Sequence, residues 1–170
     1  MVLFGPNYAE ANMDGVGMSV GEICNRNVAV IGKHDSIYAA ARLMRDQHVS
    51  DVVVVESSGG VNIPVGILTD RDIVVSAVAE ELDLNTVLIS DFMTRNFLLA
   101  DDDDDVLGTL KRMRYKGIRR IPVINQRHGL TGILSIDDIL DSLVEQLNDI
   151  DQIIAHTEHK SEQLDLQLSN

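Results

Sequence analysis

The chain has 170 residues, of which 45% are hydrophobic and only 4% aromatic, so one ordinary domain or two small ones can form around an aliphatic core. The formal net charge of −13 argues against binding to duplex nucleic acid, because contacts between cations and phosphates supply most of that affinity. No apolar run is long enough to span a membrane, the N-terminus lacks the pattern of a secretory signal, and the single cysteine excludes an internal disulfide, so we expect a cytoplasmic protein.

The first periodic elements follow an N-terminal segment, residues 1–18, whose glycines and proline predict a loose arm. A short apolar segment occupies 28–31, and Asp35 or Ser36 is expected to cap the next helix. Apolar residues then recur at i, i+3, i+4 and i+7 on one helix face: Ile37, Ala40, Ala41 and Met44. Two apolar strands and a second helix complete a β-α-β-β-α order, with the strands at 52–55 and 65–68.

The same order returns in the second half of the chain. GILTDRDI at 66–73 recurs as GILSIDDI at 132–139, an offset of 66, while the segments before it align at an offset of 69. The difference falls in a connection between strands, where insertions cost little. We therefore predict an α+β fold in which two β-α-β-β-α repeats pack with pseudo-two-fold symmetry, the first at 19–80 and the second at 87–148.

Residues 149–170 continue the last helix as a C-terminal helical extension. Apolar residues spaced by three and four form a stripe along it: Leu140, Leu143, Leu147, Ile150 and Ile154. The stripe can pack on the repeats or against a helix of a second subunit, and the sequence leaves both arrangements open.

Two tandem repeats that end in Gly-apolar-apolar-Thr/Ser-x-x-Asp resemble the cystathionine-beta-synthase (CBS) domain pair. The signature residues here run from Gly66 to Asp72 and from Gly132 to Asp138, and IRRIPV at 118–123 and MTRN at 93–96 support the resemblance. It covers most of the chain and implies a stand-alone regulatory module rather than an enzyme. The resemblance also implies a homodimer that signals to a separate effector protein. The ligands it implies are AMP, ADP or ATP, bound in clefts between the repeats, with NAD(H) or S-adenosylmethionine as alternatives and no required cofactor.

The two Asp residues that end the motifs suit a ribose. One carboxylate can accept hydrogen bonds from both ribose hydroxyls, so Asp72 and Asp138 are the candidates. The hydroxyls of Thr69 and Ser135, three residues earlier, can donate to a phosphate or ribose oxygen. Both Asp residues can instead be plain helix caps, since Asp is favoured at that position.

A phosphate and an adenine need further partners. Half of the 14 Lys and Arg residues lie between 111 and 127, a local concentration that could receive a small anion. Phosphate contacts at a helix N-terminus are expected from Arg71, Arg119 and Arg120. An apolar slot for adenine is expected at the first strand and the entry to the second strand of each repeat: Ala29, Val30, Val49, Ser50, Leu98, Leu99 and Ile118.

The two clefts are expected to be unequal. The first repeat has Ser50 and Asp51 where the second has Arg119 and Arg120, and an acid at this place should repel a phosphate.

Other chemistry is less well supported. The run ADDDDDV at 100–106 admits a metal site. Its register places Asp104 and Asp105 at a helix start, however, where the macrodipole favours carboxylates. Cys24 aligns with Met93 and is expected to be packed rather than nucleophilic. A metal-dependent hydrolase that uses the Asp run is one rival hypothesis, but it needs a nucleophile or water activator near a base, and no such set is visible. A dimeric structural adaptor with vestigial clefts is the other.

Overall fold

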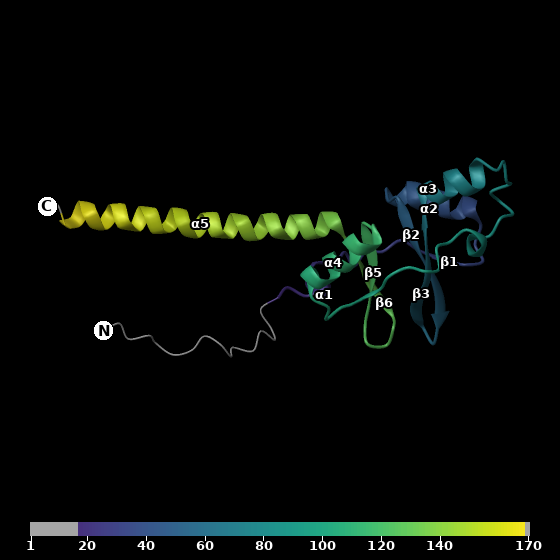
Figure 1. Ribbon diagram of the computed structural model, residues 1–170, viewed down its shortest axis with the longest axis horizontal. Coiled ribbons are helices and arrows are strands. Elements are labelled where there is room, and N and C mark those ends of the chain that lie inside the picture. The colour runs from purple at the N-terminus through teal and green to yellow at the C-terminus, as the bar shows by residue number, and fades with distance from the viewer. Residues whose placement is uncertain (1–16, 169–170) are drawn as a thin grey trace.

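The computed structural model describes the backbone of residues 17–168 and the side chains of residues 17–154 and 156. The arm predicted at 1–18 therefore lies outside the described residues, apart from Gly17 and Met18. The described chain forms two small sheets flanked by short helices, and one long helix extends away from them (Figure 1).

The first repeat contains one three-stranded sheet in the order β1-β2-β3. β1 runs parallel to β2, and β2 pairs with β3 in an antiparallel hairpin. The closing helix begins as a short α-helical turn and continues as a π-helix. The elements are β1 (Val30–Gly32), α2 (Ile37–Gln47), β2 (Asp51–Ser58), β3 (Val61–Thr69), α3 (Asp70–Asp72) and η1 (Ile73–Val78).

The second repeat has the same topology, with β4 parallel to β5 and β5 antiparallel to β6. Its elements are β4 (Ala100–Asp101), α4 (Val106–Lys116), β5 (Arg120–Ile124), β6 (Leu130–Ser135) and α5 (Ile136–Leu168). The predicted α+β fold of two β-α-β-β-α repeats is thus confirmed. The first strand of each repeat begins later than its apolar segment, at Val30 and Ala100.

The first long helix of each repeat starts at a side-chain cap. Ser36 Oγ accepts a hydrogen bond from the amide of Ala39 at 3.2 Å, so Ser36 is the cap of α2. Asp105 Oδ2 accepts from the amide of Gly108 at 2.7 Å and caps α4. The capping role expected for the end of the Asp run is confirmed, since each oxygen satisfies an amide that the helix leaves without a partner.

The two repeats exchange the short segments that precede them. Val20 of α1 (Val20–Ile23) and Cys24 are buried in the core of the second repeat. Ile89 of η2 (Ile89–Asp91) is buried in the core of the first. The core of each repeat therefore includes a segment that precedes the other repeat in the chain. The division of the chain at 19–80 and 87–148 stays a prediction from the sequence repeat.

These exchanged segments pair with the strand that carries the Gly-Ile-Leu motif. Asn25 and Ile133 of β6 exchange two backbone hydrogen bonds of 2.9 Å. A Cβ atom at Gly132 would lie 2.6 Å from Cys24 Sγ and 3.0 Å from the carbonyl oxygen of Asn25. The glycine is required because the backbones approach too closely for a side chain.

α5 is 33 residues long. Its first turns pack against the second repeat. Ile139 is buried there, and Ser142 Oγ lies 2.9 Å from Met18 Sδ. The rest of the helix projects away from both repeats (Figure 1). Among residues 17–168 no helix combines the length and apolarity needed to cross a membrane.

Candidate functional site

A cleft of about 120 Å³ lies between the two repeats. One wall comes from the segment before β1 and from β2 in the first repeat. The other wall comes from β5, β6 and the start of α5 in the second. The lining residues are Asn25, Asn27, Val28, Ala29, Val49, Asp51, Val53, Arg120, Ile133, Ser135 and Asp138.

Ser135 and Asp138 form a capping box at the start of α5. Asp138 Oδ2 accepts hydrogen bonds from the amide of Ser135 at 2.7 Å and from its hydroxyl at 2.6 Å. The amide of Asp138 in turn donates to Ser135 Oγ at 3.1 Å. Thr69 and Asp72 make the same three contacts, at 3.0, 2.8 and 3.1 Å.

The capping interpretation of these Asp residues therefore describes the geometry of both repeats. Both hydrogen bonds from Ser135 end on Oδ2 of Asp138, so the carboxylate, which lines the cleft, keeps further accepting capacity. One carboxylate can cap the helix and accept a ligand hydroxyl at the same time, so the two interpretations are compatible.

Arg120 closes the cleft by an ion pair that crosses from the second repeat to the first. Its guanidinium contacts the carboxylate of Asp51 and donates to Ser50 Oγ at 2.5 Å. The Asp51 side chain is 8% exposed. Burial raises the pKa of Asp51, and the charge of Arg120 opposes that rise. The acid expected to repel a phosphate is thus paired with an arginine expected to bind one.

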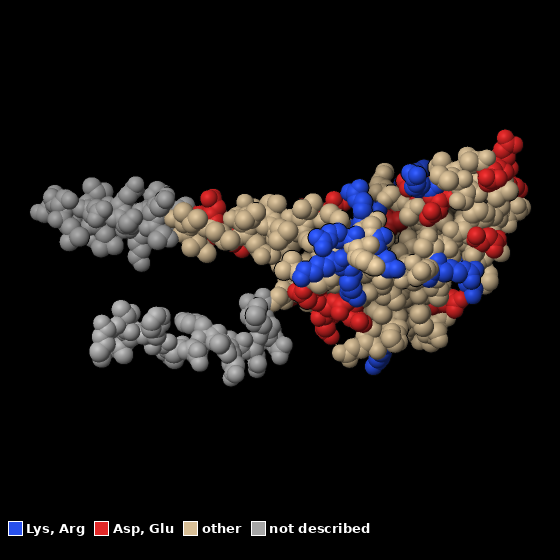
Figure 2. Space-filling model, viewed as in Figure 1, with Lys and Arg blue, Asp and Glu red and all other residues tan. Residues whose placement is uncertain are grey.

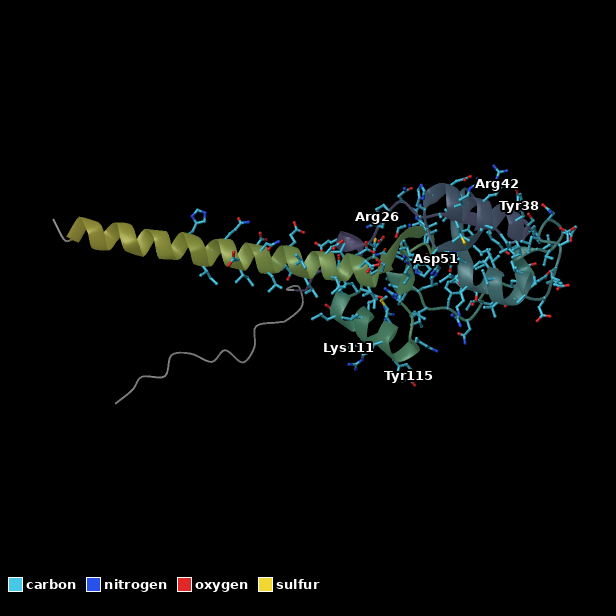
Figure 3. The ribbon with its side chains drawn as sticks, turned by 90° about the horizontal axis from the view of Figure 1, so that it is seen from above. Arg26, Tyr38, Arg42, Asp51, Lys111 and Tyr115 are labelled. Atoms are coloured by element: carbon cyan, nitrogen blue, oxygen red, sulfur yellow. The ribbon has the colours of Figure 1, made fainter. Side chains whose placement is uncertain are left out.

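The cleft lies at the junction of the repeats. Figure 3 shows α2, with Tyr38 and Arg42, on one side and α4, with Lys111 and Tyr115, on the other, while Asp51 lies between them. Two carboxylates and one guanidinium line the cleft, and the guanidinium is already paired. Among the residues that line the cleft, the cation that a phosphate would meet, Arg120, already has an acidic partner.

The structure brings part of the predicted site together. Ala29, Val49, Arg120, Ser135 and Asp138 line the cleft, and Ser50 borders it through its bond to Arg120. The predicted residues outside this lining are Val30, Thr69, Arg71, Asp72, Leu98, Leu99, Ile118 and Arg119.

Several of these residues have other surroundings. Val30 is exposed and borders a separate surface hollow with Gly32 and Val55, because successive strand residues point to opposite faces. Thr69 and Asp72 occupy the equivalent place in the other repeat, beside the pairing of Ile67 with Thr94. Arg71 and Arg119 are exposed.

Five lining residues besides Asp51 were not predicted: Asn25, Asn27, Val28, Val53 and Ile133. Asn25 could have been found from its alignment with Thr94 in MTRN, a segment that supports the family resemblance. Val53 could have been found from strand alternation, since Val49, Asp51 and Val53 recur at every second residue.

The local concentration of cations covers a different surface. Figure 2 shows Lys and Arg side chains gathered over α4 and the adjacent strand. The exposed members are Lys111, Arg112, Arg114, Lys116 and Arg119. Arg112 pairs with Asp104 and Arg26 pairs with Asp102 at 2.8 Å, so the Asp run is partly neutralised within the protein. In the part of the chain that the structure describes, no group of His, Cys, Asp and Glu side chains is arranged to hold a metal ion.

Comparison with known proteins identifies the architecture. The model of the CBS domain matches residues 20–78 and again 89–145. Hypoxic response protein 1 of Mycobacterium tuberculosis is 32% identical over 124 residues, which cover 73% of this chain and 84% of that protein. Protein MK0525 of Methanopyrus kandleri is 32% identical over 123 residues, 72% of this chain but only 61% of that protein.

One solved structure carries ligands of the expected class. The CBS domain pair of protein MJ0100, in complex with 5′-methylthioadenosine and S-adenosyl-L-methionine, superposes with a TM-score of 0.64 and is 25% identical. The match covers 76% of this chain and 98% of that one.

Proposed function

Because the chain belongs to the family of CBS-domain proteins, we propose that it is a regulatory module that binds the adenosine part of a ligand between its two repeats. The observation that carries this proposal is the cleft that joins Asp138 and Ser135 of the second repeat to the segment before β1, which contributes Asn25, Asn27, Val28 and Ala29. AMP, ADP and ATP are the leading ligands, and NAD(H) and S-adenosylmethionine are alternatives that share the same adenosine end.

Each part of an adenosine has a partner in this cleft. The free lone pairs of Asp138 would accept hydrogen bonds from the ribose hydroxyls, and Ala29 and Val49 offer an apolar surface for the base. The cleft of about 120 Å³ is smaller than the roughly 300–1,000 Å³ of typical ligand sites. Its walls must therefore move apart when a ligand enters.

That movement supplies the regulatory signal. The walls belong to different repeats and are held together by the pair between Arg120 and Asp51. A ligand that favours the widened cleft shifts the packing of one repeat on the other, because it binds the two states with different affinity. We propose that a separate effector protein responds to this change.

One observation favours S-adenosylmethionine over a nucleotide in this cleft. A phosphate would have to draw Arg120 away from Asp51, which would leave a buried carboxylate without its cation. The sulfonium and ammonium groups of S-adenosylmethionine need no cation from the protein, so this ligand would not have to take Arg120 from Asp51. A preference for this cationic ligand is thus the second candidate for the function.

Exposed apolar side chains support a homodimer formed through the repeats. Val74 and Val78 of η1, and Leu140 and Val144 of α5, occupy equivalent places after the two motifs and are 51–58% exposed. A second copy would cover this surface. If no ligand binds, the protein is the dimeric structural adaptor that we hold as the alternative.

A pair of variants tests the cleft. Asp138→Asn removes the charge that would hold the ribose, whereas Asp137→Asn makes the same change at an exposed neighbour outside the cleft. Charged hydrogen bonds contribute about 1.5–3 kcal/mol, so Asp138→Asn should weaken binding about 10- to 100-fold. Calorimetric titrations of AMP, ADP, ATP, NADH and S-adenosylmethionine measure the effect. Equal affinities of the two variants for every ligand that binds would contradict the proposed site.

A further inference from the structure

The start of α5 packs on the second repeat with one face and leaves an apolar stripe exposed on the neighbouring face. Ile139 is buried in the core, Ser142 contacts Met18, and Glu145 borders the hollow next to α1. The apolar stripe begins at Leu140 and lies on the adjacent, exposed face of the helix, with Leu143 one turn after Ile139. Its members are 42–65% exposed: Leu140, Leu143, Leu147, Ile150 and Ile154.

The spacing of this stripe is that of a coiled-coil seam. Steps of three and four alternate from Leu140 to Ile154, a mean of 3.5 residues that places these side chains at a and d of a heptad. In sequence the register continues without a break to the end of the helix, through Thr157, Ser161, Leu164 and Leu168. The seam therefore extends well past the point where α5 leaves the repeats (Figure 1).

We propose that α5 pairs with α5 of a second copy of this chain, in parallel and in register, as a two-stranded coiled coil that starts at Leu140. The helix from Leu140 to Leu168 is about 43 Å long, at about 1.5 Å per residue. Its seam begins at the apolar patch of Leu140 and Val144 on the second repeat, so the two surfaces are continuous.

The charges beside the seam select a parallel pair. The e positions after the first heptad are all acidic, Asp151, Glu158 and Asp165, and the g positions hold Gln146, Ile153, Lys160 and Gln167. An antiparallel pair sets e against e, which places acid opposite acid along the seam. A parallel pair sets g against e of the next heptad, so Gln146 meets Asp151 and Lys160 meets Asp165.

A parallel pair also fixes how the two copies meet. Both second repeats then lie at the same end of the coil, so the second repeat of one copy is next to the second repeat of the other. An antiparallel pair would separate the two sets of repeats by the length of the coil. The proposal thus specifies that the two copies of the dimer meet second repeat to second repeat. It does not depend on ligand binding.

Disulfide formation between copies tests the register. In a parallel pair in register, each a position lies opposite its own copy, whereas f positions lie on the outside. Leu147→Cys, at a, should form a covalent dimer at least ten times faster than Gln152→Cys, at f, under mild oxidation. Both side chains are exposed, so neither variant should disturb folding. The wild-type protein, whose single cysteine Cys24 is buried, is the background control.

The other outcomes overturn the proposal. Equal rates for the two cysteines, or no covalent dimer with either, exclude a parallel pair and indicate that residues 1–16 or another protein covers the stripe. Amide hydrogen exchange of residues 150–168 gives an independent measurement. Protection that falls at least tenfold on Leu147→Asp but not on Gln152→Asp supports the coil, and exchange that is already fast in the wild type contradicts it.

Discussion

The ion pair between Arg120 and Asp51 offers a sharp test of how the two repeats are held together. Arg120→Met keeps an apolar stem but removes the guanidinium, so the Asp51 side chain, 8% exposed, loses its cation. A buried polar group without a partner costs about 1–3 kcal/mol. Because the Arg120 side chain is 38% exposed, water already screens part of the pair, and we expect a loss of about 2 kcal/mol. In a chain of this length, that loss lowers the Tm by about 4–8 °C.

The pH dependence of this loss gives a second readout. Burial raises the pKa of Asp51 above its ordinary value of 3.8, so the folded protein keeps the proton to a higher pH than the unfolded chain does. The contribution of Asp51 to stability is therefore full below pH 3.8 and declines as the pH rises through the folded pKa. Without Arg120 the folded pKa rises further, so wild type and variant should differ least in acid and most near neutral pH.

Urea unfolding, followed by circular dichroism between pH 4 and pH 8, measures this difference. The double variant Asp51→Asn/Arg120→Met is the control, because it removes both charges together. It should recover much of the stability at neutral pH and abolish the pH dependence of the difference. A loss that is the same at every pH, or a double variant less stable than Arg120→Met, would refute the reasoning.

Two further predictions compare matched positions. Gly132→Ala should lower the free energy of unfolding by about 1–3 kcal/mol, and Gly66→Ala should cost less, because the new Cβ meets the backbone of Asn25 in the first case but a flexible methionine side chain in the second. Chemical denaturation of both variants checks this order, and equal losses would contradict it. Asp105→Ala should cost about 0.5–2 kcal/mol by removing the cap of α4. Asp103→Ala, at an exposed neighbour, should change stability by less than about 0.5 kcal/mol, and a larger loss there would mean that the run has a role besides capping.

The topology of the fold could be predicted because the same pattern of strands and helices occurs twice in the sequence. The offsets of 66 and 69 align every strand and helix of one repeat with the other, so a weak local signal in one copy is supported by the other copy. Ser36 and Asp105 cap their helices as expected, since capping depends on residues only three positions away. Local chemistry was therefore readable from the sequence.

The exchange of leading segments was not predictable in this way. An alignment of the repeats places Cys24 beside Met93 but does not say which core either one enters. In the fold Cys24 joins the core of the second repeat, and Met93 packs against that of the first. This choice depends on the path of the chain between repeats, which repeat periodicity does not encode.

In the candidate site, too, local contacts could be predicted from the sequence and contacts between distant residues could not. Asp138 and Ser135 were predicted from a motif whose members are three residues apart. The pair between Arg120 and Asp51, by contrast, joins residues 69 positions apart and depends on how the repeats dock. The neighbours Ala29 and Val30 were both proposed, although adjacent residues of an extended chain face opposite sides.

The central claim is that the cleft between the repeats receives the adenosine end of a ligand, and competition by adenosine tests it most directly. AMP and S-adenosylmethionine would each be titrated by calorimetry into ligand-stripped wild-type protein, first alone and then with excess adenosine. Saturable binding of at least one of them, displaced by adenosine, is the result that we predict. No saturable binding, or binding that adenosine leaves unchanged, would contradict the account and favour a structural adaptor.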